Sequence, residues 1–157
     1  MQIRVHRLDD LTEALTLAAR LDELAEEQTR EVRAEDYPAG SVEAFLRAEF
    51  EAPETLLLVA REEGTSAALG LCLVGPGREP LTGESTPLIL VLHVEPAQRH
   101  QSLAGQLVAA AERHLAQRGQ TRLAGRVGAG DDALISIGER RGFIRRWEWV
   151  ERGLHSA

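Results

Sequence analysis

The first fifty residues alternate between a strand-like and a helix-like pattern of hydrophobic positions. Residues 2–8 place apolar and polar side chains alternately, the period of two that is typical of a strand. From Leu11 to Glu27 apolar residues recur at every third or fourth position, which predicts a helix with one buried face, capped by Asp9 or Asp10. A second helix is predicted to begin after Ser41.

Three segments in the middle of the chain predict further strands. Residues 55–61 and 67–74 are apolar runs that end in Glu-Glu-Gly and Gly-Pro-Gly, and we expect them to pair as an antiparallel hairpin. Residues 75–87 are rich in proline and glycine and predict a long loop. Residues 88–94 are too continuously apolar for a strand with one wet face, so we predict the central strand of the sheet there.

Two more strands and two helices are predicted after Pro96, which stops the central strand because it cannot donate a hydrogen bond to the sheet. An amphipathic pattern then continues to Gly119, and a short strand is expected over 121–127. A last helix should follow Asp131 or Asp132. We expect a final strand after residue 143, on which Trp147 and Trp149 share one face. The two indole rings are most simply core packing, although they can also line an acceptor cleft or a dimer contact.

Composition narrows the classes of function. The chain has 157 residues, 43% of them hydrophobic, which predicts a single domain over 1–157. Its net charge is −7 and the charges are interleaved, so a nucleic-acid partner is not expected. Lysine is absent, which excludes a lysine Schiff base and a Walker A loop. Cys72 stands alone in an apolar stretch and is interpreted as packing, while the longest apolar runs are too short to span a membrane. We therefore expect a cytoplasmic protein.

The segment from Gln98 to Leu107 is the first candidate for chemistry. It follows a buried strand and opens a helix, where backbone N–H groups without intrahelical partners favour an anion. Ser102, Ala104 and Gly105 would let a phosphate approach the backbone, and Arg99 offers a side-chain donor. The competing interpretation is an ordinary turn with small residues for close packing.

Two motifs at this end of the chain resemble those of a known family. Residues 94–107, VEPAQRHQSLAGQL, resemble the acetyl-CoA motif V-x-P-x-x-R-x-x-G-x-G/A-x-x-L of the GNAT superfamily of N-acetyltransferases. Residues 131–143, DDALISIGERRGF, resemble the second motif of that family, which ends in Gly-Phe. The predicted order of elements is also similar over nearly the whole chain. The resemblance implies an α/β (α+β) GNAT fold, with a mixed, mostly antiparallel sheet of six to seven strands flanked by about four helices.

The resemblance also implies acetyl-CoA as a co-substrate and places its binding site. The end of the central strand would pair with the pantetheine arm, and the Leu92 amide would lie near the thioester carbonyl, where a donor stabilises the oxyanion that forms during attack. The backbone positions implied for binding are Leu92, His93, Val94, Gln98, Arg99, His100, Gln101, Ser102, Leu103 and Ala104.

Three positions depart from or vary within the family pattern. Ser102 replaces the first motif glycine, which the backbone tolerates if φ is negative. Ala104 lies within the allowed alternation. Gly138 stands where the family usually carries the tyrosine that protonates the departing CoA thiolate.

Candidates for proton transfer come from the same region. His93 is the best candidate base, because histidine exchanges protons near neutral pH and this one adjoins the implied thioester site. The competing interpretation is a histidine buried for packing. Glu95, at the open end of the same strand, is the second candidate, and its alternative is an inert carboxylate. Ser136 can donate a hydrogen bond from the last helix or be an ordinary surface serine.

The leading hypothesis is transfer of acetyl from acetyl-CoA to a primary amine by direct attack, with no metal. The alternative is a non-catalytic CoA-binding or protein-interaction domain of the same fold, which Gly138 favours. A small-molecule or peptide amine is the expected partner, without nucleic acid or membrane, and a homodimer is plausible. By the resemblance, the acceptor would lie between the first two helices and beside the loop after Val74, near Glu26, Glu27, Glu31, Glu35, Asp36 and Tyr37. An acidic run between helices is also typical of a solvated face.

Overall fold

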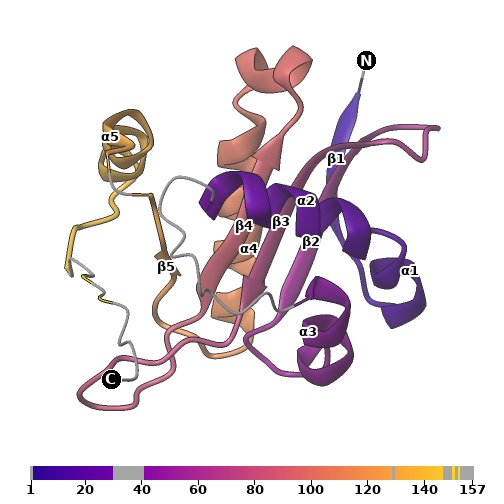
Figure 1. The fold of residues 1–157 in the computed structure, drawn as a ribbon. Coiled ribbons are helices and arrows are strands. Elements are labelled where there is room, and N and C mark those ends of the chain that lie inside the picture. Colours follow the sequence, from indigo (N-terminus) through magenta and orange to yellow (C-terminus); the bar gives the residue numbers. More distant parts are fainter. Residues whose placement is uncertain (1, 30–40, 129, 147–149, 151, 153–157) are drawn as a thin grey trace.

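The fold is a sheet covered by helices on both faces, as a computed structural model of the chain shows (Figure 1). The structure describes residues 2–29, 41–128, 130–146, 150 and 152. The elements in chain order are β1 Ile3–Arg7, α1 Leu11–Leu15, α2 Ala18–Thr29, α3 Val42–Glu49, β2 Leu56–Glu62, β3 Ala68–Gly75, β4 Leu88–Val94, the 3₁₀ helix η1 Pro96–Gln101, α4 Leu103–Gln117, β5 Ala124–Gly125 and α5 Asp132–Arg140.

The five strands lie in the order β1-β2-β3-β4-β5. The first four pair antiparallel, whereas β5 runs parallel to β4 and pairs with it only at Leu88 and Ile89. The predicted hairpin is therefore confirmed as β2 and β3. The strand predicted at 88–94 is β4, but only Val91 and Val94 of it are buried, so β2 and β3 are the more deeply buried strands. The strand β4 lies fourth in the sheet, so β3 takes the central position expected for it.

Each face of the sheet has its own hydrophobic core. Leu57, Val59, Leu71, Leu73 and Val91 face one way and pack with the buried residues of α1, α2 and α3. The alternate positions of the same strands face the other way and pack on α4. Figure 1 shows the same layers, with α1 to α3 in front of the sheet and α4 behind it. Within the described residues, none of the helices is long and apolar enough to span a membrane.

Local chemistry explains where the helices begin. Side-chain oxygens of Asp10, Ser41 and Asp131 accept hydrogen bonds from the first turns of α1, α3 and α5, as expected of N-caps. The single helix predicted from Leu11 to Glu27 is divided instead into α1 and α2. The hydroxyl and the amide of Thr16 both donate to the carbonyl of Glu13, and this tight turn ends α1.

The helix α5 ends in a Schellman motif, which gives the Gly-Phe pair of the second motif a structural reason. Gly142 adopts a φ of +90°, its amide donates to the Glu139 carbonyl, and the Phe143 amide donates to the Gly138 carbonyl at 3.0 Å. Only glycine adopts this left-handed conformation without a steric cost. The pair therefore fixes the direction in which the chain leaves α5.

Two predicted strands differ from the structure. The strand expected over 121–127 is reduced to Ala124–Gly125, and residues 144–146 adopt no regular structure. Trp147 and Trp149 lie outside the described residues. Within the described residues the sheet has five strands and five α-helices flank it, whereas six to seven strands and about four helices were predicted. The mixed, mostly antiparallel character is confirmed.

Candidate functional site

The far end of β4 carries an open backbone edge, created by a bulge at Leu90. Leu73 pairs with Val91 and Val74 pairs with Ile89, so Leu90 is an extra residue without a partner on β3. Before the bulge the Pro87 carbonyl accepts from Ala124 of β5, whereas after it the Glu95 amide donates to Leu69 of β3. The inserted residue therefore reverses the backbone direction: odd-numbered residues direct their N–H and C=O groups to β5 before Leu90 and to β3 after it.

Leu92 and Val94 consequently direct their N–H and C=O groups away from β3, because hydrogen-bonding pairs alternate along an antiparallel ladder. Two side chains reach the carbonyls of this edge. Gln28 Nε2 of α2 donates to the Leu92 oxygen at 2.9 Å, and Arg99 Nε donates to the Val94 oxygen at 3.5 Å. Since β5 pairs with β4 only at its other end, no described strand covers this edge.

The chain beyond β4 makes a turn and then begins α4. Pro96–Gln101 form η1, and Ser102 follows with φ +54° and ψ +24°, a left-handed conformation. Because α4 makes its first backbone hydrogen bond from Gln106 to Ser102, the amides of Leu103, Ala104 and Gly105 have no partner within the helix. The negative φ under which the backbone would tolerate serine in place of the first motif glycine is therefore not met at Ser102.

This turn fits an anionic group on two observations. No acidic residue lies in the first turn of α4, where a macrodipole leaves partial positive charge. An ideal Cβ on Gly105 would lie 1.5 Å from Nη2 of Arg141, so the guanidinium rests on the bare backbone of that turn. Gln98 Oε1 is buried here without a hydrogen-bond partner in the described structure. The side chains of His100 and Gln101 are outside the description.

His93 and Glu95 form one hydrogen-bonded pair on the face of β4 that α2 covers. The Nε2 atom of His93 lies 3.2 Å from Oε1 of Glu95, and Nη2 of Arg20 lies 3.3 Å from the same oxygen. The imidazole is 14% exposed and the carboxylate 37%, so Glu95 is the more accessible of the two. The two candidate bases are thus alternatives in sequence but partners in space.

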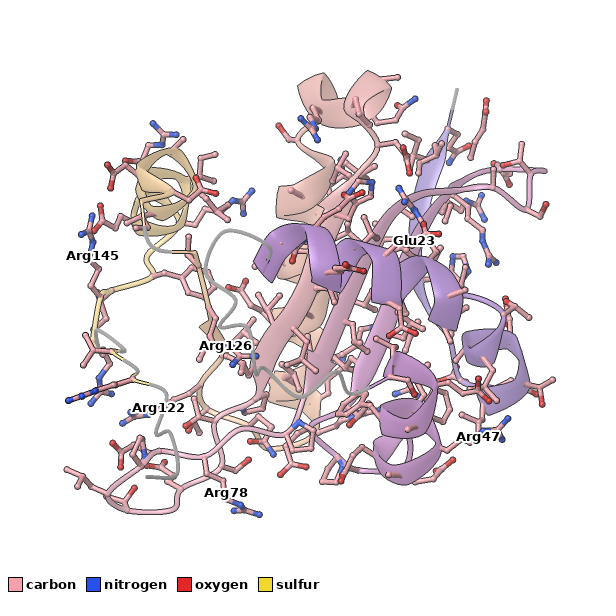
Figure 2. The ribbon with its side chains drawn as sticks, in the orientation of Figure 1. Glu23, Arg47, Arg78, Arg122, Arg126 and Arg145 are labelled. Carbon is pink, nitrogen blue, oxygen red and sulfur yellow. The ribbon has the colours of Figure 1, made fainter. Side chains whose placement is uncertain are left out.

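A second ion pair orients Arg20. Its Nη1 lies 3.2 Å from Oε2 of Glu23, one turn along α2 (Figure 2). The hydrogen bond to Glu23, followed by the contacts with Glu95, raises the pKa of Arg20 against the opposing effect of its burial. The guanidinium is therefore charged and held between two carboxylates.

The other sequence candidates lie apart from this pair. Ser136 is exposed on α5, and its hydroxyl has no hydrogen bond to any described residue. Gly138, on the same helix, has room for a side chain, since an ideal Cβ would meet only the Phe143 Cβ at 3.7 Å. Glu26 and Glu27 are exposed on α2. The remaining acceptor-side candidates, Glu31, Glu35, Asp36 and Tyr37, lie outside the described residues.

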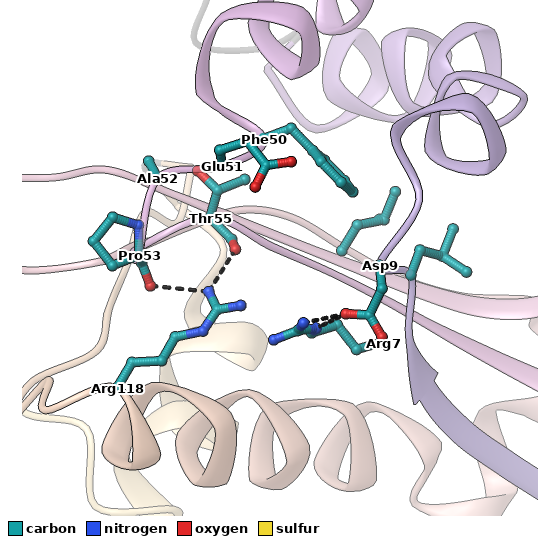
Figure 3. Close-up of a pocket in the computed structure, with 10 residues that line it drawn as sticks. Arg7, Asp9, Phe50, Glu51, Ala52, Pro53, Thr55 and Arg118 are labelled. Carbon is teal, nitrogen blue, oxygen red and sulfur yellow. Dashed lines mark hydrogen bonds and ion pairs between the residues drawn. The ribbon is translucent and has the colours of Figure 1, made fainter.

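A pocket of about 260 Å³ lies at the opposite end of the sheet (Figure 3). It is formed where β1 ends, β2 begins and α4 ends, far along each element from the β4 edge. Arg118 Nη1 donates to the carbonyls of Pro53 and Thr55 at 3.0 and 2.9 Å, while Arg7 pairs with Asp9. These contacts hold the C-terminal end of α4 against the sheet. The candidate site lies at the N-terminal end of α4.

Sequence reasoning did not select Arg20, Gln28 or Arg141. The first two lie on α2, 75 and 64 residues before their respective partners Glu95 and Leu92, and only the packing of α2 on β4 brings them together. The one signal in the sequence was Gly105, which we interpreted as space for a phosphate and which also seats a guanidinium.

Comparisons with known proteins agree with this geometry. No curated protein matches the sequence. Among solved structures, the chain is similar to the aminoglycoside N-acetyltransferase AAC(6')-Iy in complex with the bisubstrate analogue CoA-S-monomethyl-acetylneamine, at 14% identity and TM-score 0.71 over 99% of this chain and 100% of that one. A putative acetyl transferase from Pyrococcus furiosus matches at 18% identity and TM-score 0.71, over 98% and 100% of the two chains.

A ribosomal-protein-alanine N-acetyltransferase from Brucella melitensis biovar Abortus 2308 matches at 17% identity and TM-score 0.63, over 97% of this chain and 100% of that one. At such identities these likenesses establish the fold. The sequence itself matches the acetyltransferase (GNAT) family over residues 18–143, which include β4, the turn before α4 and the Gly-Phe pair. The chain belongs to the acetyltransferase (GNAT) family.

Proposed function

We propose that the protein transfers the acetyl group of acetyl-CoA to a primary amine by direct attack. The observation that carries the proposal is the convergence of three features at the end of β4: the outward edge at Leu92, the His93–Glu95 pair and the first turn of α4. Membership in the acetyltransferase family supports the same reaction.

Acetyl-CoA supplies an activated thioester, and the residues present suit its parts. The edge at Leu92 and Val94 offers backbone groups to the amides of a pantetheine arm. An amide of the arm would replace Gln28 Nε2 as the hydrogen-bond donor to the Leu92 carbonyl. The amides of Leu103, Ala104 and Gly105 suit a pyrophosphate. The outward Leu92 amide is the proposed donor to the carbonyl oxygen that gains charge during attack.

Attack forms a bond from the amine nitrogen to the acetyl carbon, and the bond from that carbon to sulfur breaks. An alkylamine with a pKa near ~10.4 must first lose a proton, which a positioned base accelerates by roughly 10²–10⁴. We assign this proton to the His93–Glu95 pair. Glu95 is the more exposed member of the pair, and its Oε1 atom is contacted by both Arg20 Nη2 and His93 Nε2.

As the amide forms, the nitrogen loses its second proton to solvent. The thiolate that leaves must gain a proton, and Gly138 offers no side chain for this step. Water is the proton donor that remains beside the half-buried Gly138, and the exposed Ser136 hydroxyl can donate a hydrogen bond from the same helix. The same position favours a second candidate function, a non-catalytic CoA-binding domain that has lost its acid. Both candidates require cofactor binding, and they differ only in turnover.

The acceptor class follows from the chemistry rather than from a recognised pocket. The similar structures include enzymes named for aminoglycosides and for a ribosomal-protein alanine, which share an amine and little else. A primary amine is therefore the acceptor class proposed here. Its identity requires a panel of amines.

Thermal unfolding with and without acetyl-CoA tests binding. Ligand at a hundredfold excess over Kd should stabilise the protein by ~2.7 kcal/mol, which corresponds to roughly 5–10 °C in Tm for a chain of this size. Absence of any shift at millimolar acetyl-CoA would contradict both candidate functions.

Release of free CoA over a panel of amines then separates the enzyme from the binding domain. A thiol reagent suits this assay because Cys72, the only cysteine, is fully buried. Binding without amine-dependent release would favour the non-catalytic alternative. In an active enzyme, His93→Ala and Glu95→Gln should each lower kcat/KM and change its pH dependence, and an unchanged profile in both variants would remove this pair from the mechanism.

A further inference from the structure

The side chain of Arg141 crosses from the end of α5 to the first turn of α4. An ideal Cβ on Gly105 would lie 1.5, 2.5 and 3.0 Å from its Nη2, Cζ and Nη1 atoms. Only a residue without a side chain leaves this space. Gly105 is buried even though it lies in the first turn of the helix, whereas Arg141 remains exposed.

This position is electrostatically unfavourable for a cation by itself. The N-terminus of a helix carries partial positive charge, and positively charged groups are stabilising at the opposite end. The helix α4 is 15 residues long and has no acidic residue in its first turn. Nor does the guanidinium of Arg141 have a hydrogen bond or ion pair with any described residue.

Two other arginines near this end of the molecule, Arg145 and Arg99, have partners. Arg145 Nε lies 2.9 Å from Oε1 of Glu139 (Figure 2), and Arg99 Nε donates to the Val94 carbonyl. Arg141 instead brings a planar fork of donors beside Gly105, the third of the residues at the start of α4 whose amides have no partner within the helix. Such a set, a guanidinium facing a helix N-terminus, suits a group with two or more anionic oxygens.

We propose that Arg141 clamps the pyrophosphate of acetyl-CoA against the first turn of α4, and that Gly105 is the seat of its guanidinium. This inference rests on the proposed function and assigns one residue of its binding site. Arg141 lies three residues after Gly138, so α5 contributes a cation to the cofactor instead of the usual tyrosine.

The clamp also gives α5 a reason to stay in place. Among the described residues, α5 has no buried side chain, and Leu134 and Ile137 are 40% and 44% exposed. An anion held by Arg141 and by the amides of α4 would join the two helices. Bound cofactor should therefore slow amide hydrogen exchange in α5 as well as at the start of α4.

Calorimetric titration of the full chain with three ligands tests the assignment. Coenzyme A carries the pyrophosphate and a 3′-phosphate, 3′-dephospho-CoA carries the pyrophosphate only, and pantetheine carries neither. Arg141→Gln should raise Kd about 10–100-fold for the first two ligands, as expected for loss of a charge-assisted contact, and leave pantetheine unchanged. Arg140→Gln, at an exposed neighbour on the same helix, is the matched control and should bind all three like the wild type.

Gly105→Ala tests the seat without removing the charge. The methyl group would displace the flexible end of Arg141, and alanine favours a helix, so the fold should persist. Gly105→Ala should weaken CoA binding, and adding it to Arg141→Gln should weaken binding little further, since both changes remove one interaction. In hydrogen exchange, CoA should protect α5 in the wild type and not in Arg141→Gln.

The possible results separate this inference from the proposed function. If the wild type binds CoA and Arg141→Gln binds it equally well, the clamp is wrong and the proposed function stands. If Arg141→Gln weakens CoA but not 3′-dephospho-CoA, Arg141 serves the 3′-phosphate and the pyrophosphate assignment is overturned. If the wild type does not bind CoA, both the function and the clamp fall.

Discussion

Replacing Ser102 by glycine should stabilise the protein, because Ser102 is held in a left-handed conformation at φ +54° and ψ +24°. An L-residue in this region pays roughly 1–2 kcal/mol relative to right-handed backbone, and glycine does not. The serine side chain does not offset this cost, since it makes no capping hydrogen bond to α4. Its carbonyl accepts from Gln106, and that bond is retained in glycine.

The gain is reduced by the unfolded state. Glycine makes the unfolded chain more flexible, which costs about 0.4–1 kcal/mol. Taking the middle of both ranges, the net stabilisation for Ser102→Gly is about 0.8 kcal/mol, or roughly 2–3 °C in Tm for a domain of about 150 residues. Urea unfolding followed by circular dichroism measures this difference directly, provided that the slope of the transition is the same in both proteins.

Ser102→Ala is the matched control, because it removes the hydroxyl but keeps the Cβ that causes the strain. Alanine should be no more stable than serine, and only glycine should show the gain. A Ser102→Gly protein no more stable than the alanine variant would refute the reasoning. It would mean that the turn before α4 is relaxed in solution or that serine has an interaction that compensates the strain.

Three further predictions concern other parts of the chain. Burial raises the pKa of the Cys72 thiol to about 12, so iodoacetamide at pH 8 should label it only after unfolding in urea, and mass spectrometry that finds rapid native labelling would contradict this. Burial, followed by the nearby Arg7 and Arg118, lowers the pKa of His114. The unfolded chain therefore binds this proton first, and stability should fall as the pH drops below about 6.5; His114→Gln should weaken that dependence in unfolding experiments across a pH series. If protonation of the thiolate limits turnover, Gly138→Tyr should have a higher kcat than Gly138→Phe, and equal kcat values would show that this protonation is not rate-limiting. Both variants should be more stable than the wild type by up to about 1 kcal/mol, because glycine is a poor helix former.

Most of the regular structure could be predicted because it depends on neighbours in the sequence. The capping residues Asp10, Ser41 and Asp131 act on amides two or three positions away, and the continuous apolar run at 88–94 predicts a strand, which the structure has as β4. The break at Thr16 was missed because the hydrophobic period continues through it. A competing hydroxyl decides the local hydrogen bonds there without changing the pattern.

The candidate site was predictable by position and not by arrangement. His93 and Glu95 lie two residues apart on a strand, so their sharing one face follows from the period of a strand. Arg20 and Arg141 could not be found in this way. Arg20 reaches the site because α2 packs on β4, and Arg141 reaches it because its side chain extends from the end of α5 to Gly105.

The extra residue Leu90 connects the two halves of the proposed chemistry. Without Leu90, the alternation of hydrogen-bonding directions would continue unchanged along β4. The odd-numbered residues, whose backbone groups face β5 at the start of β4, would then also direct their backbone groups to the open edge at the end of β4. His93 would then present its backbone to the edge, and the Leu92 amide would be consumed in pairing with β3.

With the bulge, the Leu92 amide faces the open edge while the side chain of His93 faces α2, so the proposed oxyanion donor and the proposed base come from adjacent residues and point in different directions. One inserted residue therefore allows a single strand both to hold a thioester by its backbone and to place a proton acceptor beside it. The backbone edge at Leu92 and Val94 belongs to β4 alone, so it can accept a pantetheine arm whichever residue stands at position 138, whereas the proposed grip on the pyrophosphate also needs Arg141.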